Sequence, residues 1–223
     1  MKKGMIIDQV KQLGGWFHQI DLGEGLFTRS ISPSEGPQPL NHPINRWKVI
    51  EKHLPEDLNG CRILDIGCAE GFFSIELARR GADVLAVDAA PKMIKRMDWV
   101  VKHLKLSSKI KTKVANLESF HKCKENFDYV FMIALLYHLQ HPLLGLQIVS
   151  TLANKLYLES TLHTSNDDAY LYLKPPQIGV HSIPKWYPTE KCIYSMLDYV
   201  GFNGVQTLEQ AAENRGIYYA TRT

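Results

Sequence analysis

The sequence predicts an α/β fold: a mostly parallel seven-stranded sheet with helices on both faces and an antiparallel C-terminal hairpin. Two observations lead to this prediction. Short apolar runs alternate with segments of helical period over residues 62–159, and the links between them are short. Such an order produces parallel strands joined by right-handed crossovers, with helices covering both faces. Two further apolar runs near the C-terminus predict the hairpin.

Each predicted strand is a short apolar run bounded by turn residues or charges. The clearest is the run at residues 62–66, which stops at Gly67 and suits a strand buried on both faces. The strands are expected at residues 62–66, 83–87, 111–115, 129–133, 156–159, 205–208 and 217–221.

The predicted helices have recognisable start and stop residues. Pro91 and Pro142 suit the first turn of a helix, where the missing N–H of proline is not needed. Thr189 suits an N-cap, and Gly81 and Gly201 follow helical patterns and end them. The helices are expected at residues 5–13, 45–54, 72–80, 91–104, 142–153 and 189–200.

The first 45 residues are less regular than the rest. We expect residues 1–45 to form an N-terminal extension or lid, and residues 46–223 to form the main domain. The stretch 31–43 contains four prolines and is typical of an ordered loop that anchors a lid.

Composition and charge are those of an ordinary globular protein. Apolar residues make up 45% of the chain, charged residues 22%, and the net charge is +3. This mild excess is below that of a domain built on phosphate contacts. The lysines between residues 102 and 113 favour a solvated helix face over a nucleic-acid footprint.

Cysteine spacing and hydropathy exclude several classes of protein. The four cysteines form no CxxC pair, which argues against a zinc site and a disulfide framework and favours reduced thiols. The N-terminus has no signal-peptide pattern, and no window approaches the roughly 20 apolar residues that span a bilayer. We therefore expect a cytoplasmic protein with no membrane partner.

A glycine turn joins the first predicted strand to the helix after it. Gly67 allows a sharp backbone turn beside a ligand, and Gly71 lets the helix start close to the sheet. Ala69 is small enough to keep that approach open. A dinucleotide site needs a further glycine where Phe72 stands, which argues against NAD.

Two polar residues follow the next strands along the chain. Asp88 ends the second strand, about 20 residues after the turn, where a carboxylate can bind the hydroxyls of a ribose. The alternative is a helix N-cap. Asn116 ends the third strand, where it can bond an adenine amine or serve as a plain turn residue.

The motifs at residues 63–71, 87–88 and 127–130 resemble those of the class I S-adenosylmethionine (SAM) methyltransferases. The resemblance implies a Rossmann-like class I methyltransferase fold and SAM as cofactor. The cofactor-binding residues that it implies are Asp65, Gly67, Cys68, Ala69, Gly71, Asp88, Ala89, Met93, Asn116, Leu117 and Ala134.

A narrower resemblance rests on the motifs at residues 16–23, 135–138, 186–189 and 215–217. They look like the branch of tRNA wobble-uridine (mo5U34/cmo5U34) methyltransferases, some of which use carboxy-SAM. In that branch a tyrosine, an arginine and a lysine hold the extra carboxylate. Tyr137 and Arg215 match the first two, and His18 stands in place of the lysine, which favours plain SAM because histidine is mostly uncharged at neutral pH.

The candidate general bases are His138 and His18, with His163 weaker. A hydrogen bond closing the turn before Pro142 is the alternative for His138. No third ligand accompanies His138 and His141, so no metal site is expected. For Trp16 and Trp186, the alternative to a place in the acceptor site is a place in the hydrophobic core. The candidate substrate-binding residues are Trp16, Tyr137, Glu159, Trp186 and Arg215.

Three functions remain open from the sequence. The leading one is SAM-dependent O-methylation of a small-molecule or sugar hydroxyl. The second is (carboxy)methylation of 5-hydroxyuridine at the tRNA wobble position, with tRNA as partner. The third is a non-enzymatic cofactor-binding subunit, which the polar residues Tyr137, His138 and Arg215 at the expected open site make less favourable.

Overall fold

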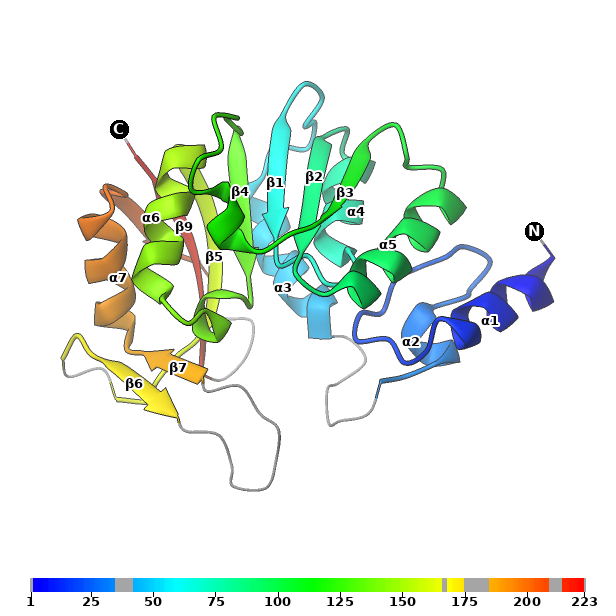
Figure 1. Ribbon diagram of the computed structural model, residues 1–223, viewed down its shortest axis with the longest axis horizontal. Coiled ribbons are helices and arrows are strands. Elements are labelled where there is room, and N and C mark those ends of the chain that lie inside the picture. Colours follow the sequence, from blue (N-terminus) through cyan, green and yellow to red (C-terminus); the bar gives the residue numbers. More distant parts are fainter. Residues whose placement is uncertain (1, 35–41, 166–167, 175–184, 209–213, 223) are drawn as a thin grey trace.

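The computed structural model describes residues 2–34, 42–165, 168–174, 185–208 and 214–222. Its central sheet has seven strands in the order β3-β2-β1-β4-β5-β9-β8. The strands β1 to β5 are parallel, and β9 runs antiparallel to both β5 and β8 (Figure 1). The strands are β1 (Arg62–Ile66), β2 (Asp83–Asp88), β3 (Ile110–Val114), β4 (Tyr129–Ile133), β5 (Lys155–Thr161), β6 (Leu171–Lys174), β7 (Lys185–Pro188), β8 (Gly204–Thr207) and β9 (Arg215–Thr221).

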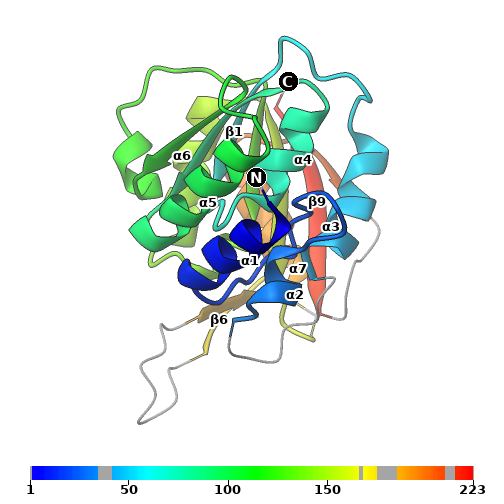
Figure 2. The ribbon, with the colours of Figure 1, turned by 90° about the vertical axis from the view of Figure 1, so that its right-hand side faces the viewer.

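Helices cover both faces of the sheet, because alternate strand residues point to opposite sides. Ile63 packs with α3, α4 and α5, whereas Leu64 packs with α6 and α7. Figure 2 shows α3 and α6 on opposite sides of the sheet. The helices are α1 (Lys3–Gln12), α2 (Thr28–Ile31), α3 (His42–Ile50), α4 (Phe72–Arg79), α5 (Pro91–His103), α6 (Pro142–Leu152) and α7 (Glu190–Tyr199), with short 3₁₀ turns η1 (Glu51–His53), η2 (Leu117–Phe120) and η3 (Leu136–His138).

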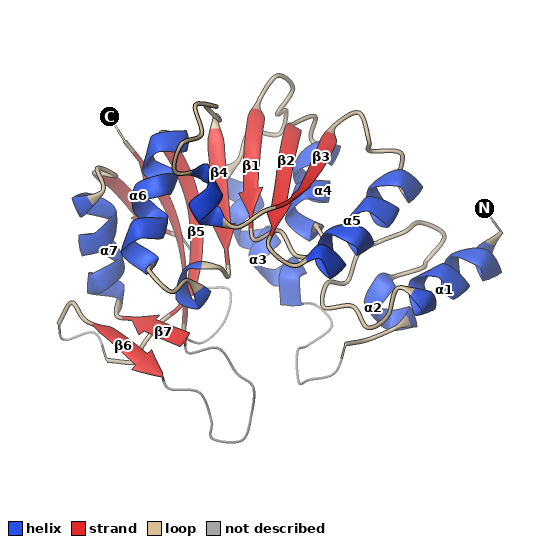
Figure 3. Cartoon of the chain, in the orientation of Figure 1, coloured by secondary structure: helices blue, strands red, loops and turns tan. Residues whose placement is uncertain are grey.

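The predicted fold class, the seven strands and the C-terminal hairpin are confirmed. Thr189 caps α7 by accepting a hydrogen bond from the Cys192 amide at 3.2 Å. The sequence did not predict α2 or the small antiparallel sheet of β6 and β7, which lies outside the central sheet (Figure 3). Most of the proline-rich stretch, residues 35–41, lies outside the described residues.

Two segments flank the carboxyl ends of the parallel strands. In Figure 1 these ends form the lower edge of the sheet, with β6 and β7 on one side and α1 and α2 on the other. The N-terminal residues Ile6, Val10 and Trp16 belong to the same apolar core as β1 and β2. Among the described residues, no helix combines the length and the apolar character needed to cross a membrane.

Candidate cofactor and acceptor site

The glycine turn between β1 and α4 follows a tight backbone path. Gly67, Ala69 and Gly71 all adopt positive φ, at 78°, 48° and 85°. A Cβ on Gly67 would lie 3.1 Å from the Leu135 side chain, and one on Gly71 would lie 2.6 Å from Met97. The turn therefore needs glycine at both ends, and it presents backbone rather than side chain to the edge of the sheet.

Asp88, at the end of β2, contacts this turn directly. One of its carboxylate oxygens accepts a hydrogen bond from the Ala69 amide at 2.9 Å, and the other accepts from the Ala90 amide at 2.8 Å. Both interpretations made from the sequence are compatible with this geometry, since Asp88 braces the start of α5 and stands beside the turn. Ala89, next in the chain, is exposed.

Two of the expected cofactor residues, Asp65 and Cys68, are buried in the core next to the turn. Asp65 is buried and accepts a hydrogen bond from Ser74 at 2.5 Å, and burial raises the pKa of its carboxyl to about 7. Burial also raises the pKa of the Cys68 thiol well above its ordinary value. These two side chains shape the turn from the core.

The remaining expected cofactor residues lie around the same edge. Asn116 accepts a hydrogen bond from the Ser119 amide at 3.1 Å and so caps η2, which is the turn role. Its neighbour Leu117 is buried. Met93 lies on the first turn of α5, and Ala134 follows β4 with a φ of 59° and donates its amide to the Glu159 carbonyl at 3.1 Å.

A buried cluster of charges lies at the carboxyl end of β5. The Glu159 side chain is fully buried, and its Oε1 accepts from Arg46 Nε at 3.1 Å and from Arg215 Nη1 at 2.7 Å. Arg215 Nη2 lies 3.4 Å from the Tyr137 hydroxyl, and its guanidinium stands 5.5 Å from the centre of that ring. Glu159, Tyr137 and Arg215, all expected at the acceptor site, are thus in contact.

His138 lies at the rim of this cluster, on η3. Its ring packs on Tyr137 with centroids 4.2 Å apart. Partial burial, together with the nearby cations Lys185 and Arg215, lowers the pKa of His138 to about 4, although the residue stays exposed to solvent. A neutral imidazole at physiological pH is able to accept a proton. His163 lies elsewhere, bonded to the Tyr170 hydroxyl at 2.8 Å.

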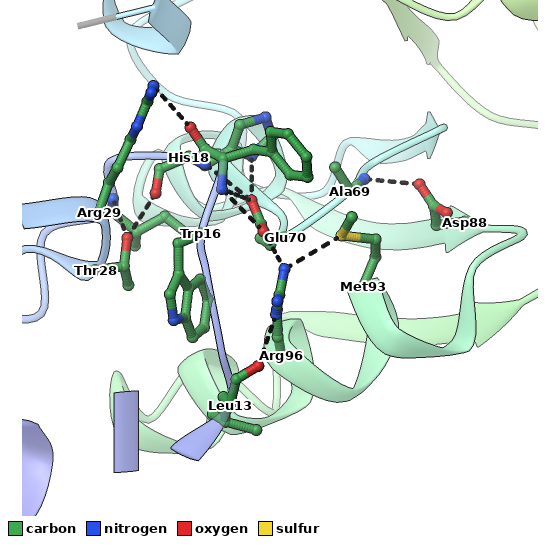
Figure 4. Close-up of polar contacts among 12 residues, drawn as sticks. Leu13, Trp16, His18, Thr28, Arg29, Ala69, Glu70, Asp88, Met93 and Arg96 are labelled. Atoms are coloured by element: carbon green, nitrogen blue, oxygen red, sulfur yellow. Dashed lines mark hydrogen bonds and ion pairs between the residues drawn. The ribbon is translucent and has the colours of Figure 1, made fainter. Parts of the chain in front are cut away.

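His18 approaches the glycine turn from the N-terminal side. Its Nδ1 lies 4.0 Å from Glu70 (Figure 4). Its ring meets that of Phe72 edge-on, with centroids 6.2 Å apart. Burial lowers the pKa of the His18 imidazole against the opposing effect of Glu70, and Arg46 and Asp88 are close enough to contribute. His18 therefore lies beside the turn, within electrostatic range of Arg46.

The two tryptophans expected at the site differ. Trp16 is fully buried, donates to the Val10 carbonyl at 3.1 Å and lies under the Arg96 guanidinium, so in this structure it belongs to the core. Trp186 is partly buried on β7, which packs against η3 beside His138.

Sequence reasoning missed Glu70, Arg46 and Arg96. All three are buried charged residues, and a charge is buried only when partners compensate it. Their partners lie far away in the chain, so no local pattern reveals them. A charged residue inside an otherwise apolar or glycine-rich segment, such as Glu70 in the turn, is the one signal that the sequence offered. Within the described ranges, no three His, Cys, Asp or Glu side chains gather to hold a metal.

Comparison with known proteins matches the centre of the chain to a family. Residues 63–153 match the family described as methyltransferase domain. The ubiquinone biosynthesis O-methyltransferase of Xanthomonas euvesicatoria pv. vesicatoria is 30% identical over 153 residues, 66% of this chain and 62% of the relative. The magnesium-protoporphyrin O-methyltransferase of Rhodobacter capsulatus is 56% identical over 46 residues, 21% of this chain and 20% of the relative. The chain spans less than two thirds of the length of these relatives.

Solved structures extend the similarity to the whole fold. The N-terminal domain of EvdMO1, determined in the presence of S-adenosylhomocysteine (SAH) and D-fucose, superposes with a TM-score of 0.77 at 20% identity, covering 100% of this chain and 97% of that one. The magnesium protoporphyrin IX methyltransferase of Synechocystis PCC 6803, with bound SAM, gives a TM-score of 0.58 at 19% identity, covering 81% and 77%. Residues 63–153 thus match a methyltransferase domain, and the chain shares its overall fold with solved structures that hold SAM or SAH.

Proposed function

We propose that this chain is a SAM-dependent methyltransferase that acts on a hydroxyl group of a small molecule or sugar. The observation that carries the proposal is the positive-φ turn at residues 67–71, braced by Asp88. Gly67 lies against the Leu135 side chain, directly before η3, which carries Tyr137 and His138. A nucleoside and an acceptor would lie on adjacent parts of one edge of the sheet, as in other α/β folds.

The residues present fit the cofactor. The turn offers backbone without a side chain of its own at Gly67, and among the described residues the Asp88 carboxylate accepts hydrogen bonds from two backbone amides, those of Ala69 and Ala90. Asp88 would accept hydrogen bonds from ribose hydroxyls. SAM, when bound, supplies an electrophilic methyl group.

The acceptor side of the site would align a hydroxyl and remove its proton. Alignment alone accounts for a large part of such catalysis, since transfer needs the reacting atoms in line. His138 would take up that proton: its imidazole is neutral at neutral pH, and its pKa of about 4 makes it a weaker base than an ordinary histidine. Trp186 and Tyr137 would line the acceptor.

The relatives support the transfer of a methyl group to an oxygen atom of the acceptor. The curated relatives are a ubiquinone biosynthesis O-methyltransferase and a magnesium-protoporphyrin O-methyltransferase, and the EvdMO1 domain was determined in the presence of D-fucose. The acceptors of these proteins differ widely, so they support the class of reaction and a small-molecule acceptor.

Two measurements test the proposal. Mass spectrometry of ligand released from the purified protein should find SAM or SAH, and calorimetry should show saturable binding of SAH. Transfer of a labelled methyl group from SAM to a metabolite extract should give a labelled ether. Failure of the protein to bind SAM or SAH would overturn the proposal, and binding without any transfer would favour the non-enzymatic subunit.

A second candidate is modification of the tRNA wobble uridine with carboxy-SAM, which the contact between Arg215 and Tyr137 favours. Against it, Arg215 already shares the Oε1 of Glu159 with Arg46. We expect wild type to prefer SAM, and Arg215→Ala to leave SAM affinity nearly unchanged. Tighter wild-type binding of carboxy-SAM that is lost in Arg215→Ala, by roughly 2 kcal/mol or more, would promote this candidate.

A further inference from the structure

Glu70 occupies the middle of the glycine turn, yet its side chain serves another segment. Its neighbour Ala69 donates to Asp88, whereas the Glu70 carboxylate is fully buried on the side of the N-terminal loop, residues 13–20. It accepts from the Phe17 amide at 3.1 Å and from the His18 amide at 2.9 Å (Figure 4). The turn and the N-terminal loop thus share one carboxylate.

Arg96 of α5 contacts both Glu70 and the N-terminal loop. We call Glu70, Arg96 and residues 13–20 the joint. Its Nη1 lies 2.9 Å from Glu70 Oε1, and its Nε donates to the Leu13 carbonyl at 3.0 Å. A buried carboxylate is costly unless charge and hydrogen bonds compensate it. Because two of the compensating donors are amides of the loop, moving the loop away would leave Glu70 with only Arg96.

The same loop is also fixed from its outer side. The Thr28 hydroxyl donates to the His18 carbonyl at 2.6 Å and accepts from the Ile20 amide at 2.9 Å. The main chain on both sides of His18 is therefore held, and its imidazole lies within electrostatic reach of Asp88 on one side and Arg46 on the other.

We infer that Glu70 is a positioning residue that makes the N-terminal loop a wall of the donor site. This rests on the proposed function, since it takes SAM or SAH as the ligand of the turn. Occupancy of the turn by the donor orders residues 67–71, and through Glu70 it orders Phe17 and His18 as well. His18 is then placed at the boundary between donor and acceptor, where its ring closes the donor side.

Amide hydrogen exchange on the full chain, with and without saturating SAH, tests the inference. In wild type, SAH should slow exchange at residues 67–71 and also at the Phe17 and His18 amides, by about tenfold or more. Protection at 67–71 without any change at Phe17 and His18 would overturn the inference and leave the proposed function standing. Absence of SAH binding would end both.

Glu70→Gln separates positioning from simple stability. The amide keeps the shape and an acceptor oxygen but loses the charge that Arg96 pairs with, so SAH should bind about tenfold more weakly. At a temperature where the variant is fully folded, SAH should still protect residues 67–71 and no longer protect Phe17 and His18. Unchanged affinity with unchanged coupling would overturn the inference.

Glu125→Gln provides the control. Glu125 pairs with Arg62, at the start of β1, at 2.7 Å and contacts neither Glu70 nor residues 13–20 of the joint. It should keep wild-type SAH affinity and the SAH-dependent protection of Phe17 and His18. Glu70→Asp gives a second check, because it keeps the charge on a shorter side chain. Partial SAH-dependent protection of Phe17 and His18 in this variant would support a role for the charge. Behaviour identical to that of Glu70→Gln would contradict that role.

Discussion

At the scale of single residues, Asp88 braces the glycine turn and the start of α5, and we propose that it also binds the ribose hydroxyls of the donor. Asp88→Ala removes the acceptor of the Ala69 and Ala90 amides and the expected partner of the ribose hydroxyls. Hydrogen bonds to a charged group are worth roughly 1.5–3 kcal/mol each, so SAH affinity should fall at least tenfold. Calorimetric titration checks this, and an unchanged dissociation constant would reduce Asp88 to a brace for α5.

His138 gives a prediction about pH. Its pKa is about 4 in the folded chain, compared with an ordinary value of about 6.5. Between these values the unfolded chain takes up a proton that the folded chain does not, so stability contributed by this group is lost as pH falls from about 6.5 to 4. Proton NMR should find the ring uncharged above about pH 5, and His138→Gln should flatten this part of the stability profile. A titration midpoint near 6.5 would contradict the lowering of the His138 pKa by burial and by the cations Lys185 and Arg215.

The residues that the sequence revealed, and those that it did not, differ in the range of their contacts. Gly67 and Asp88 were recognisable because their surroundings are local in the sequence: Gly67 lies in a turn and Asp88 at the end of a strand. Glu70 and Phe17 are far apart in the chain and meet only after folding. Trp16 shows the same limit, since only its surroundings decide between core and site.

At the scale of elements, the charge cluster joins α3, β5 and β9. Glu159→Gln leaves the buried Arg46 and the half-buried Arg215 beside a neutral amide, and breaking a buried ion pair costs about 3–5 kcal/mol. Urea unfolding should show a loss in this range. The matched control is Glu125→Gln, which breaks the exposed pair with Arg62 and should cost less than about 1 kcal/mol. Equal effects of the two substitutions would contradict the buried role.

Element boundaries were predictable wherever turn chemistry marked them. The strand at 62–66 and the helix that starts at Pro91 match β1 and α5, because glycine and proline act locally. The pair β6 and β7 was missed for the opposite reason, since its short strands carry no clear alternation and pair only with each other.

At the scale of the whole molecule, we propose that the extension at residues 1–45 and the domain at 46–223 unfold together. Ile6, Val10 and Trp16 share the apolar core of β1 and β2, so the extension has no core of its own. Calorimetry should show one transition, with equal calorimetric and van't Hoff enthalpies. A separate transition at lower temperature would mean that the extension folds independently.

The chain enters and leaves the small sheet of β6 and β7 at neighbouring points. The His163 amide donates to the Pro188 carbonyl at 2.8 Å, and the Thr189 amide donates to the Tyr170 carbonyl at 3.0 Å, so its two roots are tied together. The central sheet uses no hydrogen bond from β6 or β7. An exchange of this segment would therefore leave the strand pairing of the central sheet in place. If Trp186 lines the acceptor as proposed, such an exchange should change which acceptor is methylated and leave donor binding unchanged.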